Sequence, residues 1–294
     1  MICVPLFLLL TGYLMNKKEL SIKFYKGILH TLELYFVISI FCILFKYFVQ
    51  HQNMNLYSFI EEILNFSAAP YAWYIEMYIG LFLLIPFLNV LYYNLNSNYK
   101  KLILIGTLFL MVSLPTLFNA FELQILPCWW TNIYPILYYF IGCYLKEYEL
   151  KIPFAVNILL IIFWLLLCTF FNITLSHKSV FALAPYNNWE GWQNVISSVL
   201  VFILIKNRNF SNIPDILKII IQKISILSLG IYLNSWILDK IVYNKINNYS
   251  REVTDKLLFF PLAVLLVFLG STLLSGLANK IIFIVSWIFS KHKN

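Results

Sequence analysis

The chain has 294 residues, of which 61% are hydrophobic and only 12% are charged, and its formal net charge is +8. This small number of polar side chains cannot cover the surface of a water-soluble globule of this size. The composition therefore predicts an all-α, polytopic membrane helical bundle. The basic residues lie between apolar runs, where lysines set membrane orientation, and we therefore expect contact with membrane lipid and no nucleic-acid partner. The five cysteines stand singly, without metal-ligand spacing, so we expect no metal site and no bound cofactor.

The first apolar run, residues 1–15, ends at the basic pair Lys17 and Lys18. As a helix it would rise only about 22 Å, whereas the hydrocarbon core of a bilayer is about 30 Å thick. No basic segment precedes the run and no small-residue cleavage site follows it, which argues against a signal peptide. We expect either a tolerated short span or a chain that lacks something upstream.

Eight further apolar runs are predicted as membrane helices, which makes about nine spans with the first run. In chain order they cover residues 28–49, 73–95, 101–118, 131–146, 153–174, 190–205, 222–243 and 257–278. Residues 279–290 are expected to be an amphipathic tail or an extension of the last helix.

Charges in the connections alternate along the chain, as they do when cytoplasmic loops carry the lysines and arginines. Basic connections follow the first, third, fifth and seventh runs, whereas the loop at residues 50–69 contains Glu61 and Glu62 and no Lys or Arg. This alternation predicts an N-terminus on the outer side, and one more upstream span would return it to the cytoplasm. We expect a single membrane domain over residues 1–294 that lacks a first helix.

Several segments have features beyond hydropathy. Residues 59–64 in the second loop are predicted to form an interfacial or re-entrant turn. Trp129 and Trp130 are typical of interfacial anchors, with sugar stacking as the alternative. Pro86 and Pro135 are expected to kink or break helices that line a cavity.

Four motifs occur in a recognisable order. Val4-Pro5-Leu6-Phe7 is followed by Thr11-Gly12-Tyr13-Leu14; Trp73-Tyr74 is followed by Gly80-Leu81-Phe82-Leu83 and Pro86; Phe140-Ile141-Gly142-Cys143-Tyr144-Leu145 and Ser228-Leu229-Gly230-Ile231-Tyr232-Leu233 come later. Together they resemble the acyltransferase-3 family of integral-membrane acyltransferases, over nearly the whole chain.

The resemblance implies a fold of about ten helices and transfer of an acyl group, usually acetyl from acetyl-CoA, to a hydroxyl of a cell-envelope polysaccharide or glycolipid. It also implies the plasma membrane of a bacterium. The family's catalytic histidine lies on a helix upstream of the first motif, and no residue of this chain matches it. Asn234 and Ser235 stand where many relatives have His-Pro, and an amide cannot shuttle a proton near neutral pH.

Ionisable residues at membrane depth are the remaining candidates for acid or base chemistry. Glu76 lies at the start of the run at 73–95 and is either a site carboxylate or an interfacial one. His30 and Glu33 lie one helical turn apart and form either a polar site or an interfacial pair. None of the three is assigned a catalytic role.

Two further groups are predicted to bind substrates. Four lysines on the cytoplasmic side would attract the phosphates of acyl-CoA, although membrane topology together with contact to anionic lipids explains each of them singly. They are Lys17, Lys18, Lys23 and Lys26. Aromatic and amide side chains on the outer side suit the acceptor sugar, although an aromatic belt explains the tryptophans as well. These are Trp73, Tyr74, Trp189, Trp192, Gln193, Tyr232 and Asn234.

Two other functions are compatible with the same features. A transporter of polysaccharide or lipid-linked sugar would share the spans and the outer aromatic residues, although transporters often have two related halves and no internal repeat is found here. A non-catalytic membrane component is the third interpretation.

Overall fold

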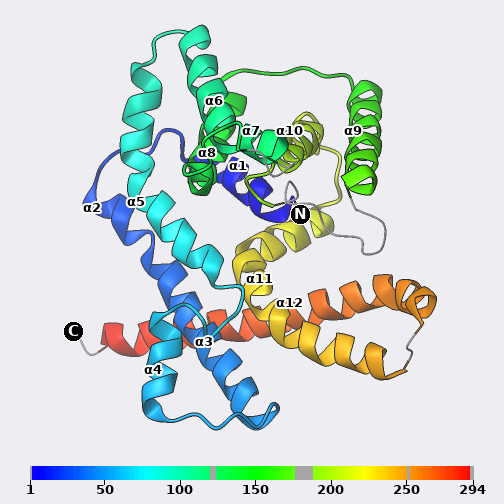
Figure 1. The fold of residues 1–294 in the computed structure, drawn as a ribbon. Coiled ribbons are helices and arrows are strands. Elements are labelled where there is room, and N and C mark those ends of the chain that lie inside the picture. Colours follow the sequence, from blue (N-terminus) through cyan, green and yellow to red (C-terminus); the bar gives the residue numbers. More distant parts are fainter. Residues whose placement is uncertain (1, 120–123, 176–187, 250–251, 292–294) are drawn as a thin grey trace. The chain divides into compact units, whose positions relative to one another are not determined.

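The computed structural model describes residues 2–119, 124–175, 188–249 and 252–291, and within these ranges the chain forms helices and no strands (Figure 1). This confirms the all-α prediction. The helices are α1 (Cys3–Met15), α2 (Ile22–Lys26), α3 (Leu29–Phe48), α4 (Leu56–Leu64), α5 (Trp73–Asn94), α6 (Asn98–Val112), α7 (Leu114–Phe118), the 3-10 turn η2 (Thr131–Ile133), α8 (Tyr134–Glu147), α9 (Phe154–Leu175), α10 (Trp192–Lys206), α11 (Asp215–Tyr249) and α12 (Val253–Lys291).

Each of the nine predicted apolar runs is helical. In the described part of the chain, six helical segments are long and apolar enough to cross a membrane, two of which combine α2 with α3 and α6 with α7. The remaining runs form α1, α8 and α10, which are only 13, 14 and 15 residues long. Residues 279–290 continue α12, so the helix extension predicted as one alternative is the correct one.

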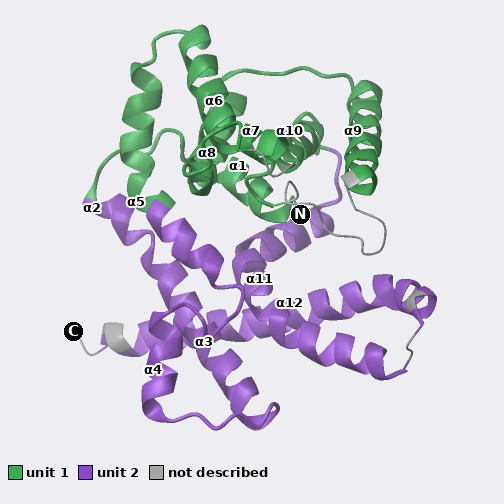
Figure 2. Ribbon diagram, in the orientation of Figure 1, with its two compact units in different colours: residues 1–21, 81–211 green, residues 22–80, 212–294 purple. Residues whose placement is uncertain are grey.

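The chain divides into two compact units, which are coloured separately in Figure 2. Unit 1 comprises residues 1–21 and 81–211, and unit 2 comprises residues 22–80 and 212–294. Both units are therefore assembled from segments that are far apart in the sequence.

Unit 1 is built around the close approach of α1 to α8. A Cβ atom on Gly12 would lie 2.0 Å from the carbonyl oxygen of Tyr139, and one on Gly142 would lie 2.2 Å from that of Leu9. Only glycine permits this distance, which is how small residues bring membrane helices together. Both glycines belong to the motifs recognised in the sequence.

Asn89 fixes the end of α1 within the same unit. Its Nδ2 donates hydrogen bonds to the carbonyl oxygens of Met15 and Lys18 at 2.9 and 2.8 Å, and its Oδ1 accepts one from the Tyr139 hydroxyl at 2.7 Å. The carbonyl groups at a helix end lack intrahelical partners. The buried Asn89 therefore satisfies groups that α1 cannot satisfy itself.

Unit 2 contains the antiparallel pair α11 and α12, which packs against α3. Gly230 of α11 faces Ser275 of α12, whose hydroxyl donates to the carbonyl oxygen of Leu227 at 3.0 Å. Small residues again set the helix spacing.

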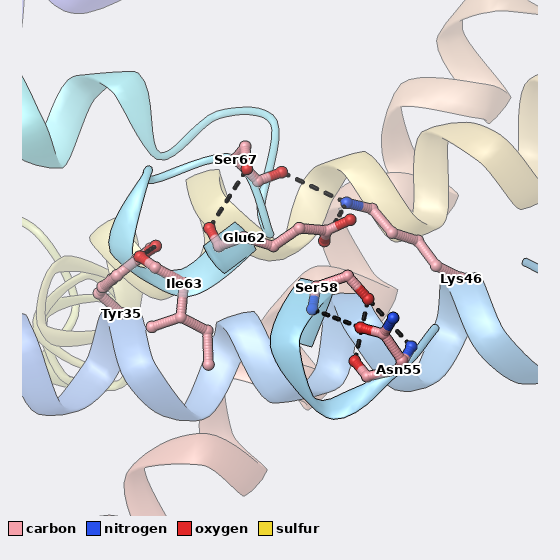
Figure 3. A network of polar contacts seen from close by, with 7 residues as sticks. All are labelled: Tyr35, Lys46, Asn55, Ser58, Glu62, Ile63 and Ser67. Atoms are coloured by element: carbon pink, nitrogen blue, oxygen red, sulfur yellow. Dashed lines mark hydrogen bonds and ion pairs between the residues drawn. The ribbon is translucent and has the colours of Figure 1, made fainter. Parts of the chain in front are cut away.

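The loop predicted to hold an interfacial segment contains α4, which is attached to α3 by polar contacts (Figure 3). Asn55 and Ser58 form a capping box at its start. The Tyr35 hydroxyl donates to the carbonyl oxygen of Ile63 at 2.6 Å, and Lys46 Nζ lies 2.9 Å from a Glu62 carboxylate oxygen. These contacts bind α4 to α3 although α4 has no buried residue.

The two prolines differ in position. Pro86 lines a cleft, as predicted, but α5 continues through it, so the helix is not broken there, and the predicted kink stays a prediction. Pro135 lies in the first turn of α8, so the prediction that it kinks or breaks a helix is wrong. Proline suits that position because the first turn does not need its missing N–H.

Candidate functional site

The residues predicted to be functional fall in both units. Unit 1 contains Lys17, Lys18, Trp189, Trp192 and Gln193. Unit 2 contains Lys23, Lys26, His30, Glu33, Trp73, Tyr74, Glu76, Tyr232 and Asn234. The four lysines predicted to bind acyl-CoA are thus divided, two in each unit.

Unit 1 has a cavity of about 620 Å³ that we call the basic pocket. Its lining comes from the end of α1, the connection from α8 to α9, and the end of α10. The lining residues are Tyr13, Glu149, Lys151, Ile152, Pro153, Lys206 and Asn207. All three segments belong to the side that loop charges predict to be cytoplasmic.

Cations surround the aromatic ring of Tyr13 at this pocket. The Nζ atoms of Lys146 and Lys206 lie 4.5 and 5.7 Å from the ring centroid. Lys206 also donates to the carbonyl oxygen of Leu145, and the Asn207 amide donates to that of Leu150 at 2.9 Å, which ties the end of α10 to the end of α8 and to the α8–α9 connection. Lys151, which also lines the pocket, lies 3.5 Å from Glu149 Oε2, and both of these side chains are exposed. The result is a ring flanked by two lysines beside an exposed ion pair, and lysines next to a ring suit a ligand with phosphates and an aromatic base.

Sequence reasoning did not assemble this pocket. In the sequence its lysines indicate only membrane topology, and Tyr13 is one residue of the Thr11-Gly12-Tyr13-Leu14 motif. The available signal was that Tyr13 and the basic residues near 146–151 and 206 share one membrane side. The lysines that were predicted lie elsewhere: Lys17 and Lys18 line a separate cleft of about 410 Å³ beside Pro86.

Lys23 and Lys26 lie in α2 of unit 2 and are exposed. A short helix with two exposed lysines matches the anionic-lipid contact considered as the alternative.

Unit 2 holds a group of stacked rings that we call the tyrosine cluster, consisting of Tyr71, Tyr74, Tyr78 and Tyr232. The Tyr71 and Tyr232 rings stack with centroids 5.5 Å apart, Tyr74 meets Tyr232 edge-on at 5.8 Å, and Tyr74 stacks on Tyr78 at 5.9 Å. Trp73 packs edge-on against Tyr74 at 6.2 Å. The structure thus joins three predicted acceptor-site residues, Trp73, Tyr74 and Tyr232.

A carboxylate adjoins this cluster. The Tyr71 hydroxyl donates to Asp239 Oδ2 at 2.8 Å. Burial, and then this hydrogen bond, raises the pKa of Tyr71 to about 12, so the phenol stays protonated and orients the carboxylate. The sequence prediction missed both residues, although Asp239 was visible as an acidic residue inside an apolar run.

The other carboxylate candidates are more exposed. Glu76 lies in the first turn of α5 and is exposed. His30 Nδ1 lies 4.0 Å from Glu33 Oε2, and both side chains are more than half exposed. The predicted pair exists, in the geometry of a surface pair on one helix face.

Asn234 is fully buried in α11, and neither its amide nitrogen nor its amide oxygen has a hydrogen-bond partner among the described residues. Burying an amide without hydrogen-bond partners costs folding free energy, so Asn234 is a position where a ligand or a water molecule can form hydrogen bonds.

The outer segment before α10 is anchored by backbone contacts. The Tyr138 hydroxyl donates to the carbonyl oxygen of Trp189 at 2.7 Å, and the Trp192 N–H donates to Thr116 Oγ1 at 3.2 Å. Trp192 is buried, with Trp164 and Phe171 edge-on against it at 5.4 Å each. Its aromatic faces therefore pack against protein, which argues against sugar stacking on this ring.

Comparison with known proteins identifies the class. A family model described as an acyltransferase domain matches residues 1–276, and the chain therefore belongs to the acyltransferase-3 family. No curated protein and no solved structure matches it. The protein is thus a membrane acyltransferase by family, with its four motifs in α1, α5, α8 and α11.

Proposed function

We propose that the protein transfers an acyl group, usually acetyl, from cytoplasmic acyl-CoA to a hydroxyl of a cell-envelope polysaccharide or glycolipid in the plasma membrane of a bacterium. Family membership supports acyl transfer. The observation that carries the choice of donor is the basic pocket, where Lys151, Lys206 and Tyr13 meet on the side predicted to be cytoplasmic.

The donor's parts correspond to the chemistry of this pocket. Coenzyme A carries phosphates at one end, which lysine ammonium groups bind as point charges. Its adenine can stack on Tyr13, a ring that already lies against Lys146 and Lys206. The pocket's volume of about 620 Å³ is within the range of small-molecule sites.

The reaction needs an acceptor hydroxyl and a base. The hydroxyl oxygen attacks the thioester carbonyl carbon, the C–S bond breaks, and an ester C–O bond forms. The hydroxyl proton passes to the base, and the departing thiolate takes up a proton to leave as the free thiol. A base must lie within hydrogen-bond reach of the hydroxyl.

Glu76, His30 and Glu33 remain predictions for this role. We add Asp239, because it is half-buried and already hydrogen-bonded to Tyr71 beside the tyrosine cluster. Trp73, Tyr74, Tyr232 and Asn234 remain proposed acceptor-site residues.

The function is tested by transfer of label from acetyl-CoA. Membranes containing this chain, or a form extended by any in-frame upstream codons, are incubated with acetyl-labelled CoA thioester, and base-labile label in the envelope glycan is measured. We expect label above that of membranes without the protein. If both forms leave the glycan unlabelled while glycan export depends on the protein, the transporter interpretation replaces this one.

A further inference from the structure

A second cavity of unit 1 lies between α9 and α10 and has a volume of about 360 Å³. The two helices run antiparallel, because the Asn157 amide of α9 donates to the Leu200 carbonyl of α10 while Trp164 Nε1 donates to the Gln193 carbonyl. Each helix contributes one continuous stripe of residues at helical spacing to the cavity.

The lining changes in character along the helices. Near the end of α9 and the start of α10 it is polar, whereas about 12 Å further along α10, at 1.5 Å per residue, it is apolar. The polar lining residues are Thr169, Asn172, Gln193, Asn194 and Ser197, and the apolar ones include Ile161, Leu165, Leu200 and Val201. The polar end is the one that loop charges predict to face outward.

None of the described residues that line this cavity is charged. An anionic head group would find no cation there, and a buried unpaired charge is strongly disfavoured. Hydroxyl and amide groups on a ligand can instead pair with the amide and hydroxyl side chains of the lining.

The side-chain amide nitrogen of Gln193 is a buried hydrogen-bond donor at this cavity. The residue is 2% exposed, it lines the cavity, and its Nε2 has no hydrogen-bond partner among the described residues. A buried amide donor without a partner costs stability, which a ligand acceptor would recover.

The polar end of the cavity is held rigid. Ser197 donates to the Gln193 carbonyl at 2.7 Å, and the Asn194 amide donates to the Asn188 carbonyl at 2.8 Å. Trp164 is fixed by its own hydrogen bond and by the Trp192 ring. A pocket formed in advance binds without a large ordering cost.

We propose that this cavity binds a neutral glycolipid, with hydroxyl groups of its sugar at Gln193, Asn194 and Ser197 and the start of its lipid chain beside Leu200 and Val201. Binding of the glycolipid does not require acyl transfer and can be measured without acyl-CoA.

Binding is measured with the purified protein in phosphatidylcholine nanodiscs containing monoglucosyl diacylglycerol, diacylglycerol or phosphatidylglycerol, without acyl-CoA, by native mass spectrometry of the protein–lipid complexes. We expect selective binding of the glucosyl lipid. Gln193→Leu should weaken it about tenfold, equivalent to about 1.4 kcal/mol, while leaving thermal stability unchanged or higher, because the variant removes an unpaired buried donor.

Gln222→Leu, at an exposed position of α11, is the matched control and should bind as the wild type does. Gln193→Met provides a second variant of similar length should the leucine variant fail to fold. Equal binding of phosphatidylglycerol, or unchanged binding in both folded Gln193 variants, would overturn the proposal. Acetyl transfer without any glucosyl-lipid binding would refute this site alone, whereas selective binding without acetyl transfer would leave the site and refute the function.

Discussion

At the residue scale, the pair Lys46 and Glu62 shows how an ionisable group is accommodated in a span. Lys46 lies near the end of α3 with a side chain that is only 11% exposed, and it contacts Glu62 and the Ser67 carbonyl oxygen. Its ring contact with Trp236, at 5.8 Å from the centroid, is longer. The charge is therefore balanced mainly by α4 and the residues that follow it.

Glu62→Gln should destabilise the protein by about 3 kcal/mol, because it leaves the Lys46 ammonium group buried without its counter-charge. The free energy of unfolding in mixed micelles, measured by detergent titration, tests this. Asp215→Asn breaks the exposed pair with Lys218 and should cost less than about 1 kcal/mol. Equal costs for the two variants would show that the Lys46 pair is no more important than a surface pair.

Tyr71 gives a pH-dependent prediction. The pKa of its phenol in the folded protein, about 12, exceeds its value of about 10 in an unfolded chain. The unfolded state thus loses this proton first, so the residue's contribution to stability is complete below about pH 10 and falls as the pH rises towards 12.

Comparison of wild type with Tyr71→Phe isolates this residue from other tyrosines. The stability difference between the two proteins should change between pH 9 and 11, in favour of the variant at the higher pH. A difference that stays constant over this range would contradict the raised pKa.

At the element scale, close glycine contacts define the packing of α1 on α8. Gly142→Ala would place its Cβ atom 2.2 Å from the Leu9 carbonyl oxygen, so one helix must move. Overpacking of this kind costs about 1–3 kcal/mol, and we expect loss of yield and of stability in the detergent titration.

Gly106→Ala is the matched control, since a Cβ atom there has no neighbour within 4 Å. It lies inside α6, where alanine favours a helix over glycine by up to about 1 kcal/mol. The control should be neutral or stabilising, and a Gly142 variant that is equally stable would show that the two helices do not depend on this contact.

Hydropathy predicted the elements well for a physical reason. An apolar run in lipid must satisfy its backbone hydrogen bonds internally, which makes it a helix. Every predicted run is helical, including the short one that became α1. Hydropathy does not specify side-chain partners, so it revealed neither the Gly12 contact with α8 nor the attachment of α4 to α3.

The sites were predicted less completely because each is assembled from distant segments. Tyr13 and Lys206 are separated by most of unit 1 in sequence but line one pocket. Tyr71 and Asp239 likewise lie on opposite sides of a long unit 1 insertion. Residue type and motif position predicted Trp73, Tyr74 and Tyr232 one by one, whereas only the structure shows that their rings pack together.

At the scale of the whole molecule, membrane orientation has a natural reporter. Cys128 is exposed and lies in the loop at 119–132 that is predicted to face outward. Cys3 is also exposed and lies near the N-terminus, which is predicted to be on the outer side, so the test uses a Cys3→Ser background. In that background a membrane-impermeant maleimide should label Cys128 on intact cells, and Cys128→Ser should remove the label.

In the Cys3→Ser, Cys128→Ser background, a cysteine introduced by Asn96→Cys should react only after lysis, because that exposed connection is predicted to be cytoplasmic. Labelling of this position on intact cells would contradict the predicted membrane orientation and indicate the opposite one. The basic pocket would then face away from the supply of acyl-CoA.

Binding of the acyl-CoA donor in the basic pocket is tested by the affinity of acetyl-CoA for the purified protein in nanodiscs. Lys151→Gln removes a charge from the pocket lining, and Lys245→Gln, at an exposed position of α11, is the matched control. Loss of a phosphate contact worth about 1.4 kcal/mol weakens binding about tenfold. We predict that loss for Lys151→Gln and for Lys206→Gln, and an unchanged affinity for Lys245→Gln. Unchanged acetyl-CoA affinity in Lys151→Gln and Lys206→Gln, or equal losses in Lys245→Gln, would contradict the claim.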